Sequence, residues 1–282
     1  MVTGGAGMVG RAVVAQCQAQ GESVTAFDHH ALDITDELKL GETFAREHPD
    51  VLINCAAWTD VDGCEFDPDR AQRVNARGPE LLALACREAG ALLITISTDY
   101  VFDGRKDGFY TQRDQPNPQS VYGISKLDGE RRAQIAWART IVVRSGYIFG
   151  PGGNNFLSTF VARARRGEHL RAISDSFGTP TYAPDLARQL CRLAHLDVPG
   201  IYHIVNAGDG ASFEDFGRCA LEIAGMDKSL LERVSLNELK RPAPRPRNSR
   251  LRCLLSEPMG LVPLPDWRHA LGEFVKQQQE SQ

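Results

Sequence analysis

The N-terminal stretch Met1-Val2-Thr3-Gly4-Gly5-Ala6-Gly7-Met8-Val9-Gly10 spaces three glycines three residues apart, at Gly4, Gly7 and Gly10. Glycines between a strand and a helix allow a sharp turn, which brings backbone N–H groups and the helix N-terminus onto a pyrophosphate. The apolar pattern after Gly10 predicts that helix. Few residues precede the glycines, so either the first strand is short or part of it is missing. The stretch predicts the start of a dinucleotide-binding unit.

An acidic residue follows the next predicted strand, residues 23–27, at Asp28. At this distance from a glycine motif, an acid can bind the hydroxyls of the adenosine ribose and would repel a 2′-phosphate. Arg11, directly after the third glycine, could instead attract that phosphate. The sequence therefore leaves the choice between NAD(H) and NADP(H) open.

Strands and helices alternate regularly up to about residue 150. Buried strands are predicted at 51–54, 92–96 and 140–144, and helical patterns at 33–44, 68–89 and 122–138. Continuously apolar strands are typical of a parallel sheet that is covered on both faces. We therefore expect an α/β fold with a Rossmann-type doubly wound parallel sheet, in an NAD(P)-binding domain that spans residues 1–150.

Residues 151–282 are less regular. They contain predicted helices at 155–166, 183–195 and 212–224, and predicted strands at 170–173 and 200–205. No repeat and no low-complexity linker separates them from the first part of the chain. We expect a smaller, mainly substrate-binding lobe that is interleaved with the carboxyl edge of the sheet.

Composition excludes several classes of protein. A formal charge of −4 over 282 residues argues against bulk binding of nucleic acid or anionic membranes. No apolar run is long enough to span a bilayer, and the N-terminus lacks a secretion signal. The seven cysteines include no Cys-x-x-Cys pair, which favours reduced thiols over disulfides or zinc. No residues suggest a metal site, and we expect a cytoplasmic protein.

Tyr122 and Lys126 lie four residues apart in a predicted helix, so the phenol and the ammonium share one face. A neighbouring positive charge stabilises the phenolate and lowers the tyrosine pKa from about 10. Such a phenol can donate a proton to a carbonyl oxygen or accept one from an alcohol. The pair alone is a weak signal, because an exposed Tyr and Lys on a helix surface give the same pattern.

Polar residues also follow the predicted strands, at the edge where parallel sheets bind ligands. The hydroxyl of Thr98 could bond to a substrate carbonyl or merely satisfy the backbone at the strand end. Asn75 is either a surface helix residue or a buried polar contact behind the site. Residues 103–119 predict a substrate-facing flap or a surface crossover. Residues 240–252 carry six positive charges, which form a solvated loop or hold a diphosphate.

Together, four motifs resemble the extended short-chain dehydrogenase/reductase family. They are the glycine pattern at 4–10, Asn-Cys-Ala-Ala at 54–57, Ser-Thr-Asp-Tyr at 97–100 and Tyr-x-x-x-Lys at 122–126. The chain looks most like the dTDP-4-dehydrorhamnose reductase group. That resemblance rests on Ser-Thr-Asp-Tyr-Val-Phe at 97–102, Val-Tyr-Gly-x-Ser-Lys-Leu at 121–127, Gly-Thr-Pro-Thr at 178–181 and Arg-Pro-x-Asn-Ser-Arg-Leu at 245–251. It covers nearly the whole chain.

The resemblance implies hydride transfer from NAD(P)H to the C4 carbonyl of a dTDP-4-keto-6-deoxyhexose, in dTDP-L-rhamnose or related deoxysugar biosynthesis for cell-wall polysaccharide. By the family pattern, Tyr122 donates the proton, Lys126 lowers its pKa and holds the nicotinamide ribose, and Thr98 binds the substrate oxygen. The positions that match cofactor contacts are Gly4, Gly7, Met8, Val9, Gly10, Asp28, Asp33, Ile34, Ala57, Trp58, Thr59, Tyr122 and Lys126. Those that match substrate contacts are Thr98, Asp99, Tyr100, Tyr147, Arg245 and Arg250. The family also allows a homodimer.

Alternatives to a reductase remain at this point. Tyr147 stands where close relatives often carry Trp, which leaves the sugar and the product stereochemistry open. Related dehydratases carry Thr-Asp-Glu where Thr98-Asp99-Tyr100 stands, which disfavours dehydration. The alternatives are a nucleotide-sugar epimerase and a nucleotide-binding regulatory subunit that resembles the beta subunit of methionine adenosyltransferase. The presence of Thr98, Tyr122 and Lys126 together favours catalysis.

Overall fold

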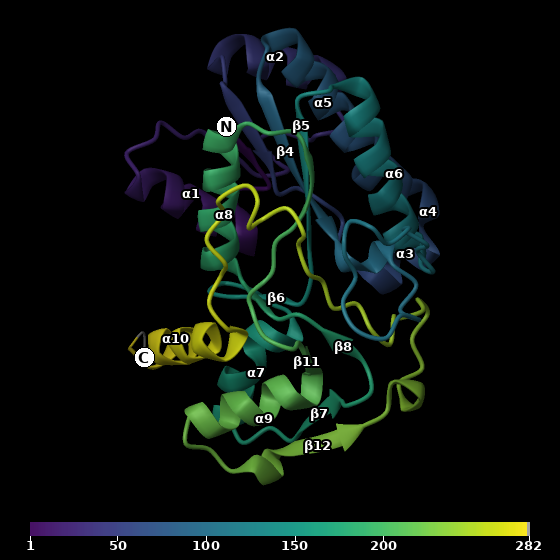
Figure 1. Ribbon diagram of the computed structural model, residues 1–282, viewed down its shortest axis with the longest axis vertical. Helices are drawn as coiled ribbons and strands as arrows, with labels where there is room; N and C mark the ends of the chain where they lie inside the picture. The colour runs from purple at the N-terminus through teal and green to yellow at the C-terminus, as the bar shows by residue number, and fades with distance from the viewer. Residues whose placement is uncertain (281–282) are drawn as a thin grey trace.

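A computed structural model describes residues 1–280 of the chain. Its centre is a parallel six-stranded sheet (Figure 1). In spatial order the strands are β2 (Ala26–Phe27), β1 (Val2–Thr3), β3 (Val51–Asn54), β4 (Leu92–Thr98), β5 (Thr140–Ser145) and β10 (Gly200–His203). Since β2 and β3 lie on opposite sides of β1, the strand order reverses there and opens a crevice at the carboxyl ends. The predicted Rossmann-type doubly wound sheet is confirmed.

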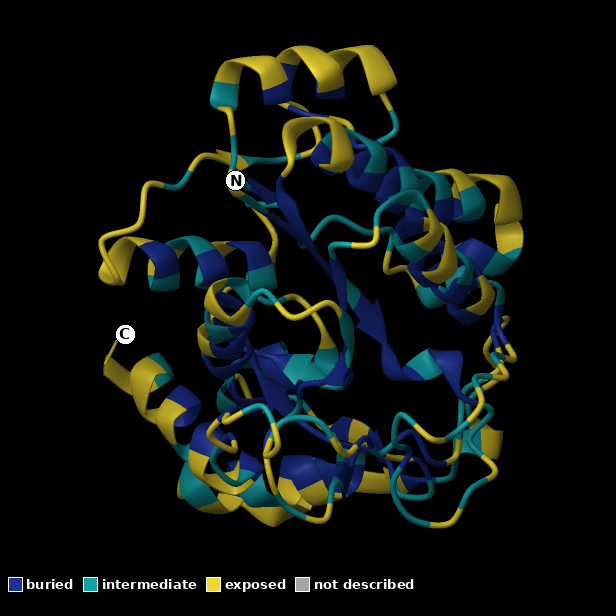
Figure 2. Ribbon diagram, turned by 45° about the horizontal axis from the view of Figure 1, so that its top comes forward, coloured by how far each residue is buried: buried dark blue, intermediate teal, exposed yellow. Residues whose placement is uncertain are grey.

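Helices cover both faces of this sheet (Figure 1). On one face α1 (Met8–Ala19) packs against α8 (Ala183–Leu196). The other face carries α2 (Glu37–Glu47), α5 (Gly78–Ala89) and α6 (Val121–Ala136), with α3 (Val61–Phe66) and α4 (Pro68–Gln72) beside α6. Two separate apolar clusters fill the spaces between the sheet and these helices. Figure 2 shows the result: buried strands between helices whose outer sides are exposed.

Several predicted elements exist with changed ends. β2 has two residues instead of five because it pairs with β1, which is equally short. α2 begins at Glu37, and its N-cap is Asp36, whose carboxylate accepts a hydrogen bond from the N–H of Lys39. The predicted helix at 68–89 is divided into α4, a π-helical turn η1 (Arg73–Arg77) and α5. The sequence did not predict α3.

The second half of the chain forms a smaller body below the sheet in Figure 1. Its helices are α7 (Phe156–Arg165), α9 (Phe213–Ile223) and α10 (Trp267–Glu280), which share one apolar cluster. Its strand pairs are β6 (Ile148–Phe149) with β9 (Thr181–Tyr182), β7 (Leu170–Ile173) with β12 (Leu231–Val234), and β8 (Phe177–Gly178) with β11 (Ala211–Ser212). Short 3-10 turns are η2 (Asp99–Val101), η3 (Lys228–Leu230) and η4 (Leu236–Glu238).

Two elements of that half return to the large sheet, namely α8 and the edge strand β10. The division into a cofactor domain at 1–150 and a mainly substrate-binding lobe at 151–282 stays a prediction, and its last two residues lie outside the described range. Within residues 1–280, the structure contains no helix with both the length and the apolar character that crossing a membrane requires.

A glycine allows α6 to approach the π-helical turn very closely. A Cβ atom at Gly129 would collide with the carbonyl oxygen of Asn75 in η1. This close approach holds the whole of α6 against η1, and the first turns of α6 carry Tyr122 and Lys126.

We predict that Gly129→Ala lowers the free energy of unfolding by about 1–3 kcal/mol, because the added methyl group overpacks this contact. Urea unfolding measures the loss. The matched control is Gly41→Ala in α2, where a Cβ meets nothing within 4 Å. There alanine is the better helix former, so stability should rise by up to about 1 kcal/mol. Equal effects of the two substitutions would contradict the prediction.

Candidate active site

A cavity of about 660 Å³ opens at the carboxyl ends of the central strands. Most of the predicted site residues line it. They are Gly7, Met8, Val9, Gly10, Ala57, Thr59, Thr98, Asp99, Tyr100, Tyr122, Lys126 and Tyr147. The others are absent from the walls of this cavity: Gly4, Asp28, Asp33, Ile34, Trp58, Arg245 and Arg250. Residues that are far apart in the sequence therefore meet in one place, as a dinucleotide and a second ligand would need.

The glycine turn between β1 and α1 leaves room for a diphosphate. Gly4 has a φ of +68°, and a Cβ there would collide with the backbone of Cys55 and Ala56. A Cβ at Gly10 would collide with the carbonyl of Gly4. Gly7 is the N-cap of α1 and has no side chain, so the first N–H groups of α1 remain for an anion. These residues fit the pyrophosphate of a dinucleotide.

Asp28 stands at the end of β2, where the adenosine ribose is expected. Its carboxylate accepts hydrogen bonds from the N–H groups of Ala31 at 2.8 Å and His30 at 3.0 Å. The N–H of Ala31, followed by that of His30, lowers the pKa of Asp28, so the residue stays ionised. Asp33 accepts similarly from the N–H and the hydroxyl of Thr35, each at 2.8 Å. Both acids stabilise local turns.

Arg11 does not extend toward the ribose site that the sequence suggested for it. Its guanidinium donates one hydrogen bond to the carbonyl oxygen of Ala6, in the glycine turn. A second hydrogen bond, of 2.8 Å, goes to the carbonyl oxygen of Gly152. Gly152 belongs to the loop before α7. Arg11 therefore ties the cofactor turn to the second half of the chain, and its predicted attraction for a 2′-phosphate is not visible in these contacts.

Asn75 is almost fully buried, at 1% exposure, so it is the polar contact behind the site and not a surface residue. Its side-chain oxygen accepts from the N–H of Trp58 at 2.8 Å, and its amide donates to the carbonyl of Trp58 at 3.0 Å. The same amide reaches the hydroxyl of Ser125 at 3.2 Å. Asn75 thus joins the loop after β3 to α6, beside Lys126. Its place in a π-helical turn agrees with the frequent use of such turns at functional sites.

The three catalytic candidates, Thr98, Tyr122 and Lys126, meet at the end of β4. The pKa of Tyr122, however, differs from the one that the sequence predicted. Burial raises the pKa of Tyr122 well above that of a free tyrosine, and hydrogen bonding to Thr98 opposes this only in part. The Nζ atom of Lys126 donates to the carbonyl of Ile96 at 2.7 Å. Burial lowers the pKa of Lys126 to about 8. The predicted lowering of the tyrosine pKa is therefore absent, because burial disfavours both charged forms.

A buried carboxylic acid, Asp99, follows directly after β4. Asp99 is 2% exposed. Its carboxylate accepts hydrogen bonds from the hydroxyls of Ser249 and Thr98. Burial raises the pKa of Asp99 to about 6. Beside it, the ring of Tyr100 meets that of Tyr122 edge to face, with centroids 5.9 Å apart. These contacts form one wall next to the catalytic candidates.

Another part of the cavity wall is aromatic. Tyr147 has a φ of +46°, unusual for a residue other than glycine. Its ring lies 4.7 Å from that of Phe213, and its hydroxyl lies 3.3 Å from the hydroxyl of Ser176. Phe156 and Phe213 also line the cavity. Sequence reasoning missed these two residues, since they come from the irregular half of the chain and belong to no motif.

The two predicted substrate arginines have partners in the protein. Arg245 pairs with Asp62 at 3.0 Å. Arg250 donates to the side-chain oxygen of Asn248 at 2.8 Å, and its guanidinium lies 5.3 Å from the centroid of the Phe109 ring. Neither residue is part of the cavity wall. Their contact with a substrate stays a prediction.

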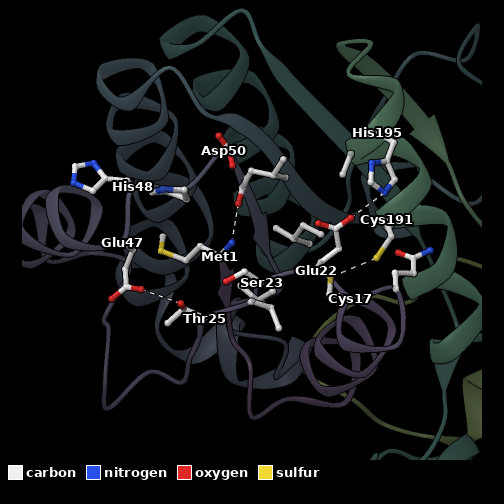
Figure 3. Close-up of a pocket in the computed structure, with 17 residues that line it drawn as sticks. Met1, Cys17, Glu22, Ser23, Thr25, Glu47, His48, Asp50, Cys191 and His195 are labelled. Carbon is white, nitrogen blue, oxygen red and sulfur yellow. Dashed lines mark hydrogen bonds and ion pairs between the residues drawn. The ribbon is translucent and has the colours of Figure 1, made fainter.

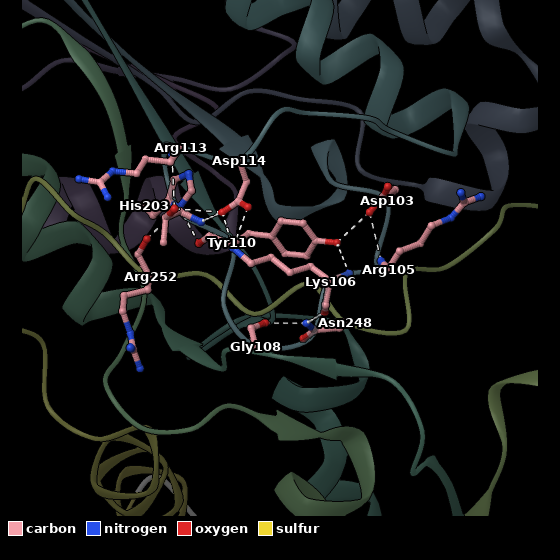
Figure 4. Close-up of polar contacts among 11 residues, drawn as sticks. Asp103, Arg105, Lys106, Gly108, Tyr110, Arg113, Asp114, His203, Asn248 and Arg252 are labelled. Atoms are coloured by element: carbon pink, nitrogen blue, oxygen red, sulfur yellow. Dashed lines mark hydrogen bonds and ion pairs between the residues drawn. The ribbon is translucent and has the colours of Figure 1, made fainter.

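Residues 103–119, which the sequence predicted as a substrate-facing flap or a surface crossover, contribute no side chain to the cavity wall. This segment, called the flap below, is anchored near its middle (Figure 4). The Nδ1 atom of the buried His203 lies 3.2 Å from the carbonyl of Tyr110 and 3.1 Å from that of Arg252. The N–H of Arg252 donates to the Tyr110 carbonyl at 2.9 Å. Burial lowers the pKa of His203 to about 4, so the imidazole is neutral. The amide of Asn248 adds further bonds to the flap backbone. These contacts fasten the flap to the C-terminal segment.

Behind the catalytic candidates lies a buried ion pair that the sequence analysis missed. Glu130 and Arg144 form two short contacts, at 2.6 and 2.9 Å, with exposures of 2% and 4%. The hydroxyl of Ser97 donates to the same carboxylate. The sequence does contain a signal for this ion pair. Glu130 lies four residues after Lys126 on the same helix face, and Arg144 interrupts an apolar strand.

We predict that Glu130→Gln lowers the free energy of unfolding by about 3–5 kcal/mol, since it leaves the Arg144 guanidinium buried without a counter-charge. Guanidinium chloride unfolding measures the loss. The control is Asp128→Asn, which removes an exposed pair with Arg132 at 2.9 Å and should cost less than about 1 kcal/mol. If Glu130→Gln costs no more than this control, the pair does not stabilise the fold as argued.

Comparison with known proteins shows which family the chain resembles. The protein-family model described as RmlD substrate binding domain matches residues 1–280. The chain is 40% identical over 278 residues to a dTDP-4-dehydrorhamnose reductase of Mycolicibacterium smegmatis, in a match that covers 98% of this chain and 84% of that protein.

Two solved structures share the fold. A dTDP-4-dehydrorhamnose reductase from Clostridium acetobutylicum is 35% identical, with a TM-score of 0.94 and coverage of 99% of this chain and 98% of that one. The dTDP-4-dehydrorhamnose reductase of Bacillus anthracis in complex with NADP is 31% identical, with a TM-score of 0.94 and 98% coverage of both chains. The resemblance inferred from the motifs is confirmed, and the chain belongs to the RmlD substrate binding domain family.

Proposed function

We propose that this protein is a nucleotide-sugar ketoreductase that reduces the C4 carbonyl of dTDP-4-dehydrorhamnose with NADPH or NADH. The observation that carries the proposal is the meeting of Thr98, Tyr122 and Lys126 in one cavity with a glycine turn that fits a dinucleotide. The names of the relatives support the substrate, and the NADP complex of the Bacillus anthracis protein supports the cofactor.

The first N–H groups of α1 and the glycine turn would bind the cofactor diphosphate, and Lys126 would hold the nicotinamide ribose. When bound, the cofactor supplies the hydride. The protein binds and orients the ketone and delivers the proton. Because burial raises the pKa of Tyr122, its phenol keeps its proton at neutral pH, as a general acid must.

Tyr122 donates that proton to the C4 oxygen of the substrate, and the Thr98 hydroxyl donates a hydrogen bond to the same oxygen. Both interactions strengthen as negative charge develops on the oxygen, so they lower the barrier instead of only binding the substrate. We assign the sugar to the space between Asp99 and Tyr100 on one side and Tyr147 on the other.

The wider biological setting stays a prediction. A role in dTDP-L-rhamnose or related deoxysugar biosynthesis for cell-wall polysaccharide follows from the proposed substrate. The cytoplasmic location and the homodimer follow from the sequence and from the family resemblance.

The proposal predicts that the protein consumes NADPH or NADH only when dTDP-4-dehydrorhamnose is present, which the nicotinamide absorbance measures. Tyr122→Phe should lower kcat by at least about 100-fold, since it removes the general acid, with the cofactor Kd nearly unchanged. The matched control is Tyr182→Phe, because that hydroxyl binds Gln277 at 3.1 Å in the C-terminal body. Unchanged turnover in Tyr122→Phe would refute its role, and cofactor binding without turnover by the unaltered protein would refute the substrate.

A second prediction concerns pH. The pKa of Lys126 is about 8, so the ammonium that would hold the nicotinamide ribose is lost as the pH rises through that value. We expect kcat/KM of the unaltered protein to fall above about pH 8, since this ratio reports groups of the free enzyme. Lys126→Met should have a lower kcat/KM and lack this decline. The same decline in both proteins would assign it to another group.

A further inference from the structure

Two thiols meet at the interface between α1 and α8, and neither lines the cavity at which the reaction is proposed. The Sγ atoms of Cys17 and Cys191 lie 3.6 Å apart, and the two residues are 174 positions apart in the sequence. Both residues are buried, with exposures of 9% and 3%. All seven cysteines, each within the described residues, are free thiols.

The geometry is close to that of a disulfide. An S–S bond is about 2.0 Å long, so the two sulfur atoms have to approach by roughly 1.6 Å. Helices at subunit interfaces shift by about 1–2 Å in allosteric transitions, so packed helices can move by this amount. The side chains of Cys17 and Cys191 already point toward each other (Figure 3). A small movement of α1 against α8 therefore suffices to form the bond.

The pair is reachable by a small oxidant. A second cavity, of about 370 Å³, lies at the amino ends of β1 and β3, and both cysteines line it (Figure 3). Glu22 and His195 stand beside the pair, with His195 on α8. A water molecule occupies about 30 Å³ in the liquid, so the cavity admits a molecule of the size of hydrogen peroxide.

The two thiols are unequal in reactivity. Hydrogen bonding from Cys191 lowers the pKa of Cys17, against the effect of burial, and the same contact raises the pKa of Cys191. The thiolate is the form of cysteine that attacks an oxidant. Cys17 is also the more exposed of the two, at 9% against 3%. We therefore take Cys17 as the attacking group and Cys191 as the thiol beside it that resolves an oxidised intermediate. Burial alone raises the pKa of Cys86, in α5, which makes that thiol inert.

We propose that Cys17 and Cys191 are a redox modification site, at which a hydroperoxide forms an intramolecular disulfide between α1 and α8. The Cys17 thiolate attacks one peroxide oxygen, the O–O bond breaks, and a sulfenic acid and a hydroxide or alkoxide form; the latter takes up a proton. The Cys191 sulfur then attacks the sulfenic sulfur, its proton leaves, and water is released. Two thiols lose two electrons in total, which the peroxide accepts.

The bond would connect a helix from the first half of the chain with a helix from the second half, both of which pack on the same face of the central sheet. α1 begins at the glycine turn, and α8 leads into the edge strand β10. A disulfide that closes a loop restricts the unfolded chain and thereby stabilises the folded protein. The stabilisation is larger for a long loop, such as this one, than for a short one. The oxidised protein should therefore melt several degrees higher than the reduced one.

The test is treatment of the reduced full chain with hydrogen peroxide, followed by peptide mapping under non-reducing conditions. We expect one linked peptide pair that contains Cys17 and Cys191, the loss of two thiols, a higher melting temperature and full reversal by dithiothreitol. Cys17→Ser and Cys191→Ser should each abolish the link, whereas Cys86→Ser should retain it. Circular dichroism in reducing buffer checks that each variant is folded.

Other outcomes overturn the proposal. They are thiols that stay unmodified, oxidation of either residue to a sulfinic acid without a link, or a disulfide that involves a different cysteine. The mapping of the unaltered protein decides between these results even where a variant fails to fold. None of the readouts depends on the sugar substrate, so the result is independent of the proposed reductase activity.

Discussion

The buried ion pair between Glu130 and Arg144 is the interaction on which the position of α6 depends. Two charges in a protein interior lose hydration free energy of several kcal/mol each, so they persist only in a geometry that satisfies both. Here the carboxylate lies on α6, the guanidinium on β5 and the Ser97 hydroxyl on β4. These contacts fix the rotation of α6 relative to two central strands. Tyr122 and Lys126, on the same helix face, adopt the orientation set by that rotation.

Burial gives the site its chemical character. It raises the pKa values of Tyr122 and Asp99 and lowers that of Lys126, so each group is shifted toward its uncharged form. A low-dielectric pocket strengthens the hydrogen bonds that a substrate oxygen receives. It also means that the Tyr122 phenol is protonated at neutral pH, as the proposed role of proton donor requires. Asn75 supports this arrangement by joining the cofactor loop to α6 through Trp58 and Ser125.

The features that the sequence predicts well are those with a local pattern. The glycine turn, the strand ends at Ala57 and Thr98 and the pair of Tyr122 and Lys126 all lie where short-range spacing placed them. The predicted lowering of the Tyr122 pKa was wrong, because that pKa depends on burial. The spacing of residues in a sequence does not indicate burial. The contact between Asp99 and Ser249 also has no local signature.

In the irregular half of the chain, five predicted elements are confirmed within two residues, namely the helices α7, α8 and α9 and the strands β7 and β10. The other strands of this half and the pairing of its strands were not predicted. Its strands have two to four residues each, and β10 joins β5 from a distant part of the sequence. Pairings of this kind leave no period in the sequence. The charge of the loop that carries Arg245 and Arg250 left two interpretations open, a solvated loop and a diphosphate site. In the structure Arg245 forms an ion pair with Asp62, and Arg250 donates a hydrogen bond to the side-chain oxygen of Asn248.

The anchoring of the flap determines the order in which the protein can be completed on the ribosome. The amide of Asn248 binds the backbone of Lys106, 142 residues earlier. The strands β1 to β5 have all been synthesised by residue 145, and domains fold from the N-terminus as they emerge. The flap must wait for its partners, Asn248 and Arg252, until only about the last tenth of the chain remains to be made. A nascent chain therefore contains all five of these strands well before residues 103–119 can be anchored, and a product that stops before residue 248 would carry this segment without the anchor that Asn248 provides.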